Sequence, residues 1–301
     1  MTSHASVRSV LVSSVAMIGV LALSAAACRR EKAVAPPVAT ASIKLSREKA
    51  PLGSPLEITY RFVVAADARF DEDYRVMLHV LDADEQLIWT DDHDPPRPTT
   101  QWKPDQTIEY TRTLFVPIYP YVGETTLHIG LYSTATEERL PLAGEDAGQH
   151  AYKVGRLQLQ AQTENVFTVF KDGWHPSEVA EKNASVEWTW TKKQATLVFK
   201  NPKRDCVFYF DLDNPGGGFT EPQQVRVALG GEVLDEFQLA PKKEVLRKIP
   251  IKVARLGTGD MAELQISVDK TFVPSLLTNS TSKDPRELGV RVFHAFIEPS
   301  K

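Results

Sequence analysis

Short runs of alternating apolar and polar residues fill most of the chain from residue 43 onward. In one of them, Ile108, Tyr110, Arg112, Leu114 and Val116 share one face of an extended segment. Alternation with a period of two predicts β-strands that bury one face. A first series of such strands is predicted over 43–46, 56–65, 75–81, 86–91, 108–116, 125–133 and 152–160.

A second series of strands follows a polar stretch at 160–164. Its members are predicted over 166–170, 186–191, 195–200, 207–212, 224–229, 232–239, 245–251, 262–268 and 290–297. Gly230 and Gly231 separate two of these segments, which predicts a two-residue hairpin turn. We therefore predict an all-β chain of two β-sandwich domains. An immunoglobulin-like or fibronectin-like sandwich covers 42–162, and a jelly-roll-like sandwich covers 163–301.

The N-terminal residues have a different pattern. Arg8 precedes an apolar run over 10–23, which is shorter than the roughly 20 residues that span a bilayer and predicts a signal peptide over 1–27. The residues before Cys28 resemble the lipobox of bacterial lipoproteins, although that family prefers leucine at the position of Ala25. The resemblance implies an acylated Cys28, with palmitate among its lipids, and a membrane-anchored protein of the bacterial cell envelope. Ordinary signal peptidase cleavage at the same bond is the alternative, and it leaves Cys28 bare.

The segment that follows is rich in alanine and proline and has no periodicity. We predict that 28–41 comprises the lipidated cysteine and an extended tether. In some bacteria, lipoprotein sorting disfavours the outer membrane when aspartate follows the cysteine. Arg29 follows Cys28 here, so the resemblance favours an exported protein on the outer membrane.

Charge and cysteine content narrow the classes of partner. The chain has 35 Lys and Arg against 39 Asp and Glu, a net charge of -4, and this lacks the basic footprint of a nucleic-acid-binding protein. We therefore predict no nucleic-acid partner. Cys206 precedes the apolar run 207–210, which predicts a small buried core residue rather than a reactive thiol.

Catalytic and metal-binding motifs are scarce. The chain has no Gly-x-Ser-x-Gly elbow and no His-Glu-x-x-His pair. Residues 211–216 start like a calcium loop, but Pro215 stands at the fifth position of that loop and Pro222 at the twelfth. His93 lies among Asp91, Asp92 and Asp94, which suits metal binding or proton transfer, or solvated loop charge as the alternative. We predict no catalytic residue, metal or cofactor. A glycan hydrolase stays an alternative, because the spacing of a catalytic carboxylate pair depends on the fold.

Aromatic and histidine residues in predicted loops are the candidate ligand contacts, since sugar rings stack on flat apolar faces. The candidates are Trp102, His93, Tyr119, Tyr121, Trp174 and His175. Packing against the core is the alternative for each tryptophan. Counting strands from Arg75 places the loops 92–107 and 134–151 at one end of the first sandwich and 82–85 and 117–124 at the other. We predict a binding surface at the first of these ends, with His93 and Trp102 on it.

Several segments resemble known envelope proteins. The first set resembles an accessory β-sandwich of bacterial envelope proteins, a class that includes modules appended to membrane glycosyltransferases. The residues that carry this resemblance are 79–85, 89, 95–96, 102–104 and 130–133. A second sandwich from the same setting is similar to 173–178, 188 and 284–290. These resemblances imply a non-catalytic envelope lipoprotein that binds a cell-envelope glycan or a glycan-handling complex. A scaffold lipoprotein that binds protein partners through sheet faces or edges is the alternative.

Overall fold

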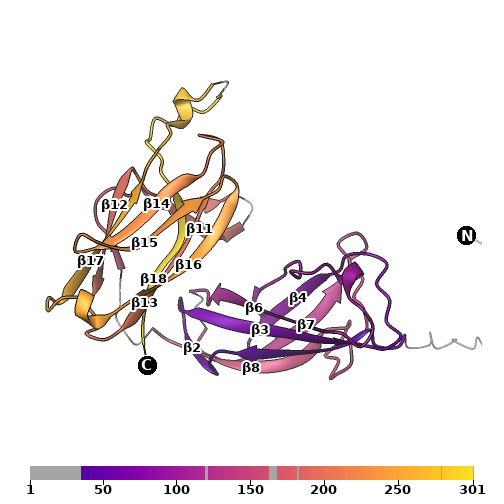
Figure 1. The fold of residues 1–301 in the computed structure, drawn as a ribbon. Helices are drawn as coiled ribbons and strands as arrows, with labels where there is room; N and C mark the ends of the chain where they lie inside the picture. The colour runs from indigo at the N-terminus through magenta and orange to yellow at the C-terminus, as the bar shows by residue number, and fades with distance from the viewer. Residues whose placement is uncertain (1–34, 119–120, 163–167, 182, 279, 301) are drawn as a thin grey trace, which may run out of the picture. The chain divides into compact units, whose positions relative to one another are not determined.

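The computed structural model describes residues 35–301 except 119–120, 163–167, 182, 279 and 301. This part of the chain has eighteen β-strands and three 3-10 turns, and the turns are η1 (Thr99–Gln101), η2 (Val253–Arg255) and η3 (Pro274–Leu276). Within the described residues there is no α-helix (Figure 1) and no helix that could span a membrane. The predicted all-β architecture is therefore confirmed.

Residues 39–160 form what we call the first sandwich, with two sheets around one hydrophobic cluster. One sheet has the order β1 (Ala39–Leu45), β3 (Pro55–Val64) and β6 (Thr107–Phe115). The other has the order β2 (Lys49–Pro51), β8 (Tyr152–Gln160), β7 (Gly123–Tyr132), β4 (Arg75–Leu81) and β5 (Leu87–Thr90). β2 pairs with β8 in parallel, and the other pairs are antiparallel.

Alternation decides which side chains enter this core. Leu56, Ile58, Tyr60 and Phe62 of β3 are all fully buried, because every second side chain of a strand points to the same face. The antiparallel register places Tyr60 opposite Tyr110 and Ile58 opposite Arg112. The face predicted for 108–116 is therefore the inward face of β6, and it brings a tyrosine and an arginine to the edge of an otherwise apolar interior.

The first sandwich begins earlier than the sequence predicts. β1 starts at Ala39, which is 1 % exposed and pairs with Val64, so the last three residues of the predicted tether over 28–41 belong to a sheet. The three-residue strand β2 was not predicted, because so short a segment shows no alternation. The predicted signal peptide over 1–27 and Cys28 lie outside the described residues.

Residues 168–299 form what we call the second sandwich. One sheet has the order β10 (Glu178–Ala180), β11 (Asn183–Trp190), β18 (Arg291–Pro299), β13 (Cys206–Asn214) and β16 (Lys243–Ile251). The other has the order β15 (Glu232–Leu239), β14 (Gln223–Leu229), β17 (Met261–Val268), β12 (Gln194–Lys200) and β9 (Thr168–Phe170). The hairpin turn is confirmed, because both of its glycines have positive φ, +57° at Gly230 and +85° at Gly231.

The core of the second sandwich is built on aromatic and aliphatic residues. Phe199, Phe208 and Phe210 are fully buried, and the last two rings stack at 5.2 Å. Cys206 is 2 % exposed within this cluster, and burial raises the pKa of its thiol to about 11. Cys206 is thus a small core residue with an unreactive thiol, as predicted.

The two hydrophobic clusters have no residue in common. The predicted boundary between 162 and 163 adjoins residues 163–167, which are not among the described residues. The division into domains over 42–162 and 163–301 therefore stays a prediction.

A candidate binding pocket at the edge of the first sandwich

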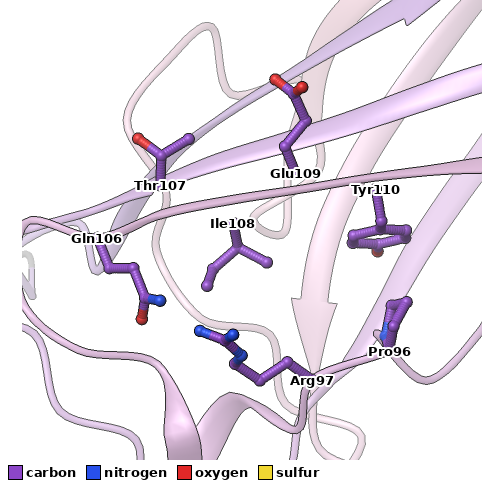
Figure 2. A pocket seen from close by; sticks show the side chains of 7 residues that line it. All are labelled: Pro96, Arg97, Gln106, Thr107, Ile108, Glu109 and Tyr110. Atoms are coloured by element: carbon purple, nitrogen blue, oxygen red, sulfur yellow. The ribbon is translucent and has the colours of Figure 1, made fainter.

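A pocket of about 370 Å³ lies between β6 and the segment that connects β5 to β6. β5 and β6 are edge strands of their respective sheets, so this segment, 91–106, crosses from one sheet to the other. Small-molecule sites in proteins typically occupy about 300–1,000 Å³, and the pocket falls at the lower end of that range. Its walls are formed by Pro96, Arg97, Gln106, Thr107, Ile108, Glu109 and Tyr110 (Figure 2).

Strand alternation divides these residues between two sides of β6. Figure 2 shows Ile108 and Tyr110 on the side that faces Pro96 and Arg97, with the Arg97 guanidinium directed toward Ile108. The carboxylate of Glu109 points to the opposite side of the strand, where it lies 3.8 Å from Nε of Arg61. The inner part of the pocket therefore combines an aromatic ring, an aliphatic side chain and a guanidinium.

A buried carboxylate lies behind the pocket. Asp91 is 7 % exposed, and its two oxygens accept hydrogen bonds from Nε and Nη2 of Arg112, both at 2.8 Å. The hydroxyl of Tyr60 donates a third hydrogen bond, at 2.7 Å. Because a buried charge is stable only when it is paired and hydrogen-bonded, these contacts explain how an aspartate is accommodated inside a sandwich.

His93 links this carboxylate to the pocket. Its Nδ1 lies 2.8 Å from the backbone carbonyl oxygen of Asp91, and its Nε2 lies 2.8 Å from the hydroxyl of Tyr110. A carbonyl oxygen can only accept, so Nδ1 donates to it, and Nε2 shares the second hydrogen bond with the Tyr110 hydroxyl. The Tyr110 ring also stacks on Tyr60, with centroids 5.3 Å apart and planes at 16°. Both contacts fix the orientation of Tyr110 at the pocket wall.

The protonation states of this network follow from its contacts. Burial alone would raise the pKa of Asp91, but hydrogen bonds from His93 and Arg112 and the charge of Arg112 lower it to about 2. Burial is the main cause that raises the pKa of Tyr110, and it also raises that of Tyr60. Both phenols are therefore protonated at neutral pH, which suits Tyr110 to contact and orientation rather than to nucleophilic attack.

Trp102 packs in the core of the first sandwich. It is 5 % exposed, and its ring contacts Phe62 and Phe70 with centroids 5.2 and 5.5 Å away. Its Nε1 donates to the carbonyl oxygen of Arg97 at 2.8 Å. The predicted surface position of Trp102 is therefore corrected to the core, in keeping with the packing alternative. Trp102 meets the pocket indirectly, through the backbone of one of the wall residues.

His93 also differs from its predicted surface position. It is 5 % exposed and lies beside Val76, with which it exchanges two backbone hydrogen bonds of 2.9 Å. Alternation continues past the end of β5, so Asp91 and His93 point inward and Asp94 lies exposed. Solvated loop charge is thus the wrong interpretation for Asp91 and His93.

The predicted placement of the loops is confirmed. Arg75 pairs with Tyr132 and Val76 with His93, so the segments that follow β5 and β7 leave at one end. At the other end, the backbone N–H of Ala83 donates to the hydroxyl of Tyr121 at 3.3 Å.

Tyr121 lies at the opposite end of β6 from the pocket. Its hydroxyl donates to the carbonyl oxygen of Glu124 at 2.8 Å, so it ties together two loops at its own end. The seven steps along β6 from Ile108 to Phe115 span roughly 23 Å at about 3.3 Å per residue. Tyr119 is outside the described residues. The aromatic candidates of the first sandwich therefore do not form one site.

Trp174 and His175 hold a segment onto the second sandwich. Nε1 of Trp174 donates to the carbonyl oxygen of Thr196 at 2.8 Å, and the ring packs edge-on against Phe170. The backbone N–H of His175 donates to Trp190, and its Nε2 lies 2.7 Å from the carbonyl oxygen of Glu287. Ligand binding at these two residues stays a prediction.

The pocket depends on residues that sequence reasoning did not select. Tyr60, Arg112, Arg97 and Gln106 were not candidates, although Arg112 carried a signal, because it interrupts an otherwise apolar and aromatic face. A charge at an inward position predicts a buried partner. Nothing in the sequence identified Asp91 as that partner. Among the described residues, no group of three His, Cys, Asp or Glu side chains could hold a metal ion.

Comparisons with known proteins give no family. No protein-family model matches the chain, and no curated protein matches it. Among solved structures, a family GH115 4-O-methyl-alpha-glucuronidase, BtGH115A, is similar at 15% identity and a TM-score of 0.31, over 51% of this chain and 20% of that chain. The CBM22-1-CBM22-2 tandem domain of Xyn10C from Paenibacillus barcinonensis is similar at 10% identity and a TM-score of 0.27, over 83% and 79%. The secreted serine protease VesC from Vibrio cholerae is similar at 10% identity and a TM-score of 0.24, over 86% and 51%.

These likenesses are distant. This chain spans about a fifth of the length of the GH115 glucuronidase, the first of these structures. They include glycan-active proteins and a secreted protease, and none of them identifies a function for this chain.

Proposed function

We propose that this protein is a non-catalytic glycan-binding protein and that the pocket beside β6 is its saccharide site. The observation that carries the proposal is the Tyr110 ring at the pocket wall, held from behind by Tyr60 and His93. A ring that is already fixed loses little conformational freedom when a sugar packs against it. Its hydroxyl is occupied by His93, so the ring supplies apolar contact.

Polar groups around the ring supply the hydrogen bonds that a sugar requires. The side-chain oxygen of Gln106 accepts from the backbone N–H of Lys103 at 3.1 Å, which orients the amide and leaves its NH₂ group as a donor. The Arg97 guanidinium adds further donors. A rigid apolar surface with a few placed polar groups is the usual composition of a small-molecule site.

The test is calorimetric titration of the protein with oligosaccharides from bacterial capsule, lipopolysaccharide and peptidoglycan. We expect saturable binding of at least one preparation. Tyr110→Leu, which retains apolar volume but removes the flat ring, is expected to weaken it roughly tenfold or more. Gln106→Ala is expected to weaken it severalfold.

Gln101→Ala is the matched control, since Gln101 is exposed in the same connecting segment but does not line the pocket. Circular dichroism must show that each variant is folded. Absence of binding to every preparation, or equal binding by wild type and Tyr110→Leu, would overturn the proposal.

We also propose that Cys28 is acylated and holds the protein at the bacterial outer membrane. The support is the lipobox-like sequence and the Ala- and Pro-rich segment after it. Metabolic labelling with a palmitate analogue is expected to mark the wild type and not Cys28→Ser. Label on both proteins, or on neither, contradicts this anchor.

A second candidate function is peptide binding at the edge of β6. β6 is the outer strand of its sheet, and an extended peptide can pair with such an edge through main-chain hydrogen bonds. A peptide would protect the backbone amides of β6 from hydrogen exchange. A saccharide in the pocket would instead depend on the side chains of Tyr110 and Gln106.

A further inference from the structure

We infer that the saccharide bound in this pocket carries a carboxylate that pairs with Arg97, as in a uronic acid residue. This inference rests on the proposed saccharide site and specifies its ligand. It follows from the charges that surround the pocket.

Among the described residues, no carboxylate lies within ion-pair distance of the Arg97 guanidinium, although Arg97 lines the pocket. The other arginines near the connecting segment are engaged. Arg112 pairs with Asp91 at 2.8 Å, and Arg75 lies 3.0 Å from a carboxylate oxygen of Asp94. Arg97 is the one cation among the residues that line the pocket, and its guanidinium therefore has a place for an anionic ligand.

The one acidic residue of the pocket wall does not neutralise Arg97. Figure 2 shows the Glu109 carboxylate on the opposite side of β6 from the guanidinium, and its ion-pair partner is Arg61 on β3. The side of β6 that faces Arg97 presents Ile108 and Tyr110, which carry no charge at neutral pH. The charge directed into the pocket is therefore a single positive one.

The chemistry of that charge selects a carboxylate. A guanidinium presents a planar fork of N–H donors that matches the two oxygens of a carboxylate. One cation balances one carboxylate, whereas a phosphate monoester carries close to two charges at neutral pH. The backbone of Arg97 is fixed by the hydrogen bond from Trp102, so the fork is presented from a restrained position.

The test compares one acidic oligosaccharide, a glucuronic acid-containing tetrasaccharide, with the same molecule after reduction of each carboxylate to a primary alcohol. We expect the acidic form to bind wild type about tenfold more tightly than the reduced form. In Arg97→Gln this difference should disappear, while affinity for the reduced form is retained. A rise from about 50 to 200 mM salt should weaken binding of the acidic form only.

Arg61→Gln is the matched control, because it removes the same charge from the outward side of the neighbouring strand. It should leave the preference for the acidic form unchanged. Equal binding of the two forms by wild type overturns the assignment of a carboxylate and leaves the saccharide site in place. Equal loss in Arg97→Gln and Arg61→Gln overturns the role of Arg97. If neither form binds and the wider panel of saccharides fails as well, the proposed function itself falls.

Discussion

Arginine–aspartate pairs joined by two hydrogen bonds occur in both sandwiches, and the pairs Asp91–Arg112 and Asp213–Arg291 lie in different surroundings. In the first sandwich, Asp91 accepts from Arg112 and from Tyr60 inside the fold. In the second, Asp213 accepts from Arg291, with N···O distances of 2.8 and 2.5 Å. The Arg291 guanidinium lies 4.9 and 5.0 Å from the ring centroids of Trp188 and Phe293.

The difference shows what strand alternation does to a charged pair. Asp213 alternates with the core residue Leu212, and Arg291 with the core residue Val292, so this pair lies on the face of its sheet opposite the core. Asp213 is nevertheless 7 % exposed, as Asp91 is. Asp91 and Arg112 lie on inward faces at the open edge of their sandwich. The same chemistry therefore braces the face of a sheet opposite the core in one sandwich and supports the wall of a pocket in the other.

The strongest test of this comparison removes one core ring from each sandwich. Phe62→Ala and Phe208→Ala are each expected to cost about 3–5 kcal/mol, because each ring is fully buried and leaves a cavity. Hydrogen exchange measured by mass spectrometry should show lost protection confined to the sandwich that carries the change. Equal loss of protection in both would contradict two independent cores.

The next largest expected effect is a difference in stability between variants of the two ion pairs. Asp91→Asn should destabilise the protein by about 3 kcal/mol, because Arg112 loses its counter-charge and the Tyr60 hydroxyl loses a charged acceptor. Asp213→Asn should cost less, about 1–2 kcal/mol, since Arg291 keeps its contacts with two aromatic rings. Urea unfolding of both variants measures the difference. A larger loss in Asp213→Asn would refute this ranking.

Acid should weaken the first sandwich through Asp91. Its pKa is lowered from 3.8 to about 2 in the fold, so its contribution to stability is fully present above the unfolded value and is lost as the pH falls toward 2. The loss amounts to about 2 kcal/mol. Urea unfolding of wild type between pH 6 and 2 should show this loss of unfolding free energy, and Asp91→Asn should lack it. The same pH dependence in the variant as in wild type would argue against a contribution from Asp91.

The sequence predicted strands better than it predicted side-chain environments, for a physical reason. The strand at Glu232–Leu239 was predicted with its observed bounds, because a two-glycine turn fixes its start. β2 and β10 were missed, since three residues are too few for a period to be visible.

The candidate site was harder to predict than the fold. His93 belongs to the observed site, but its neighbours Tyr60 and Arg112 come from strands that lie 33 and 19 positions away along the chain. Only the pairing of β3 with β6 brings them together. Trp102 was predicted as a ligand contact because its segment lacks alternation, although irregular segments also bury rings when they cross the edge of a sandwich. Position in sequence does not distinguish these two outcomes.

The smallest expected effect compares two tryptophans that make the same hydrogen bond. Trp102 donates to the carbonyl oxygen of Arg97, and Trp174 donates to that of Thr196, both at 2.8 Å. Replacing either with phenylalanine removes the N–H donor and should cost about 1–2 kcal/mol in thermal unfolding. Only Trp102→Phe should also weaken binding of the acidic oligosaccharide, by a few-fold, because only Trp102 restrains the backbone that carries the pocket guanidinium. If the two variants change affinity equally, Trp102 contributes to the fold alone and the geometry of Arg97 is set by other contacts.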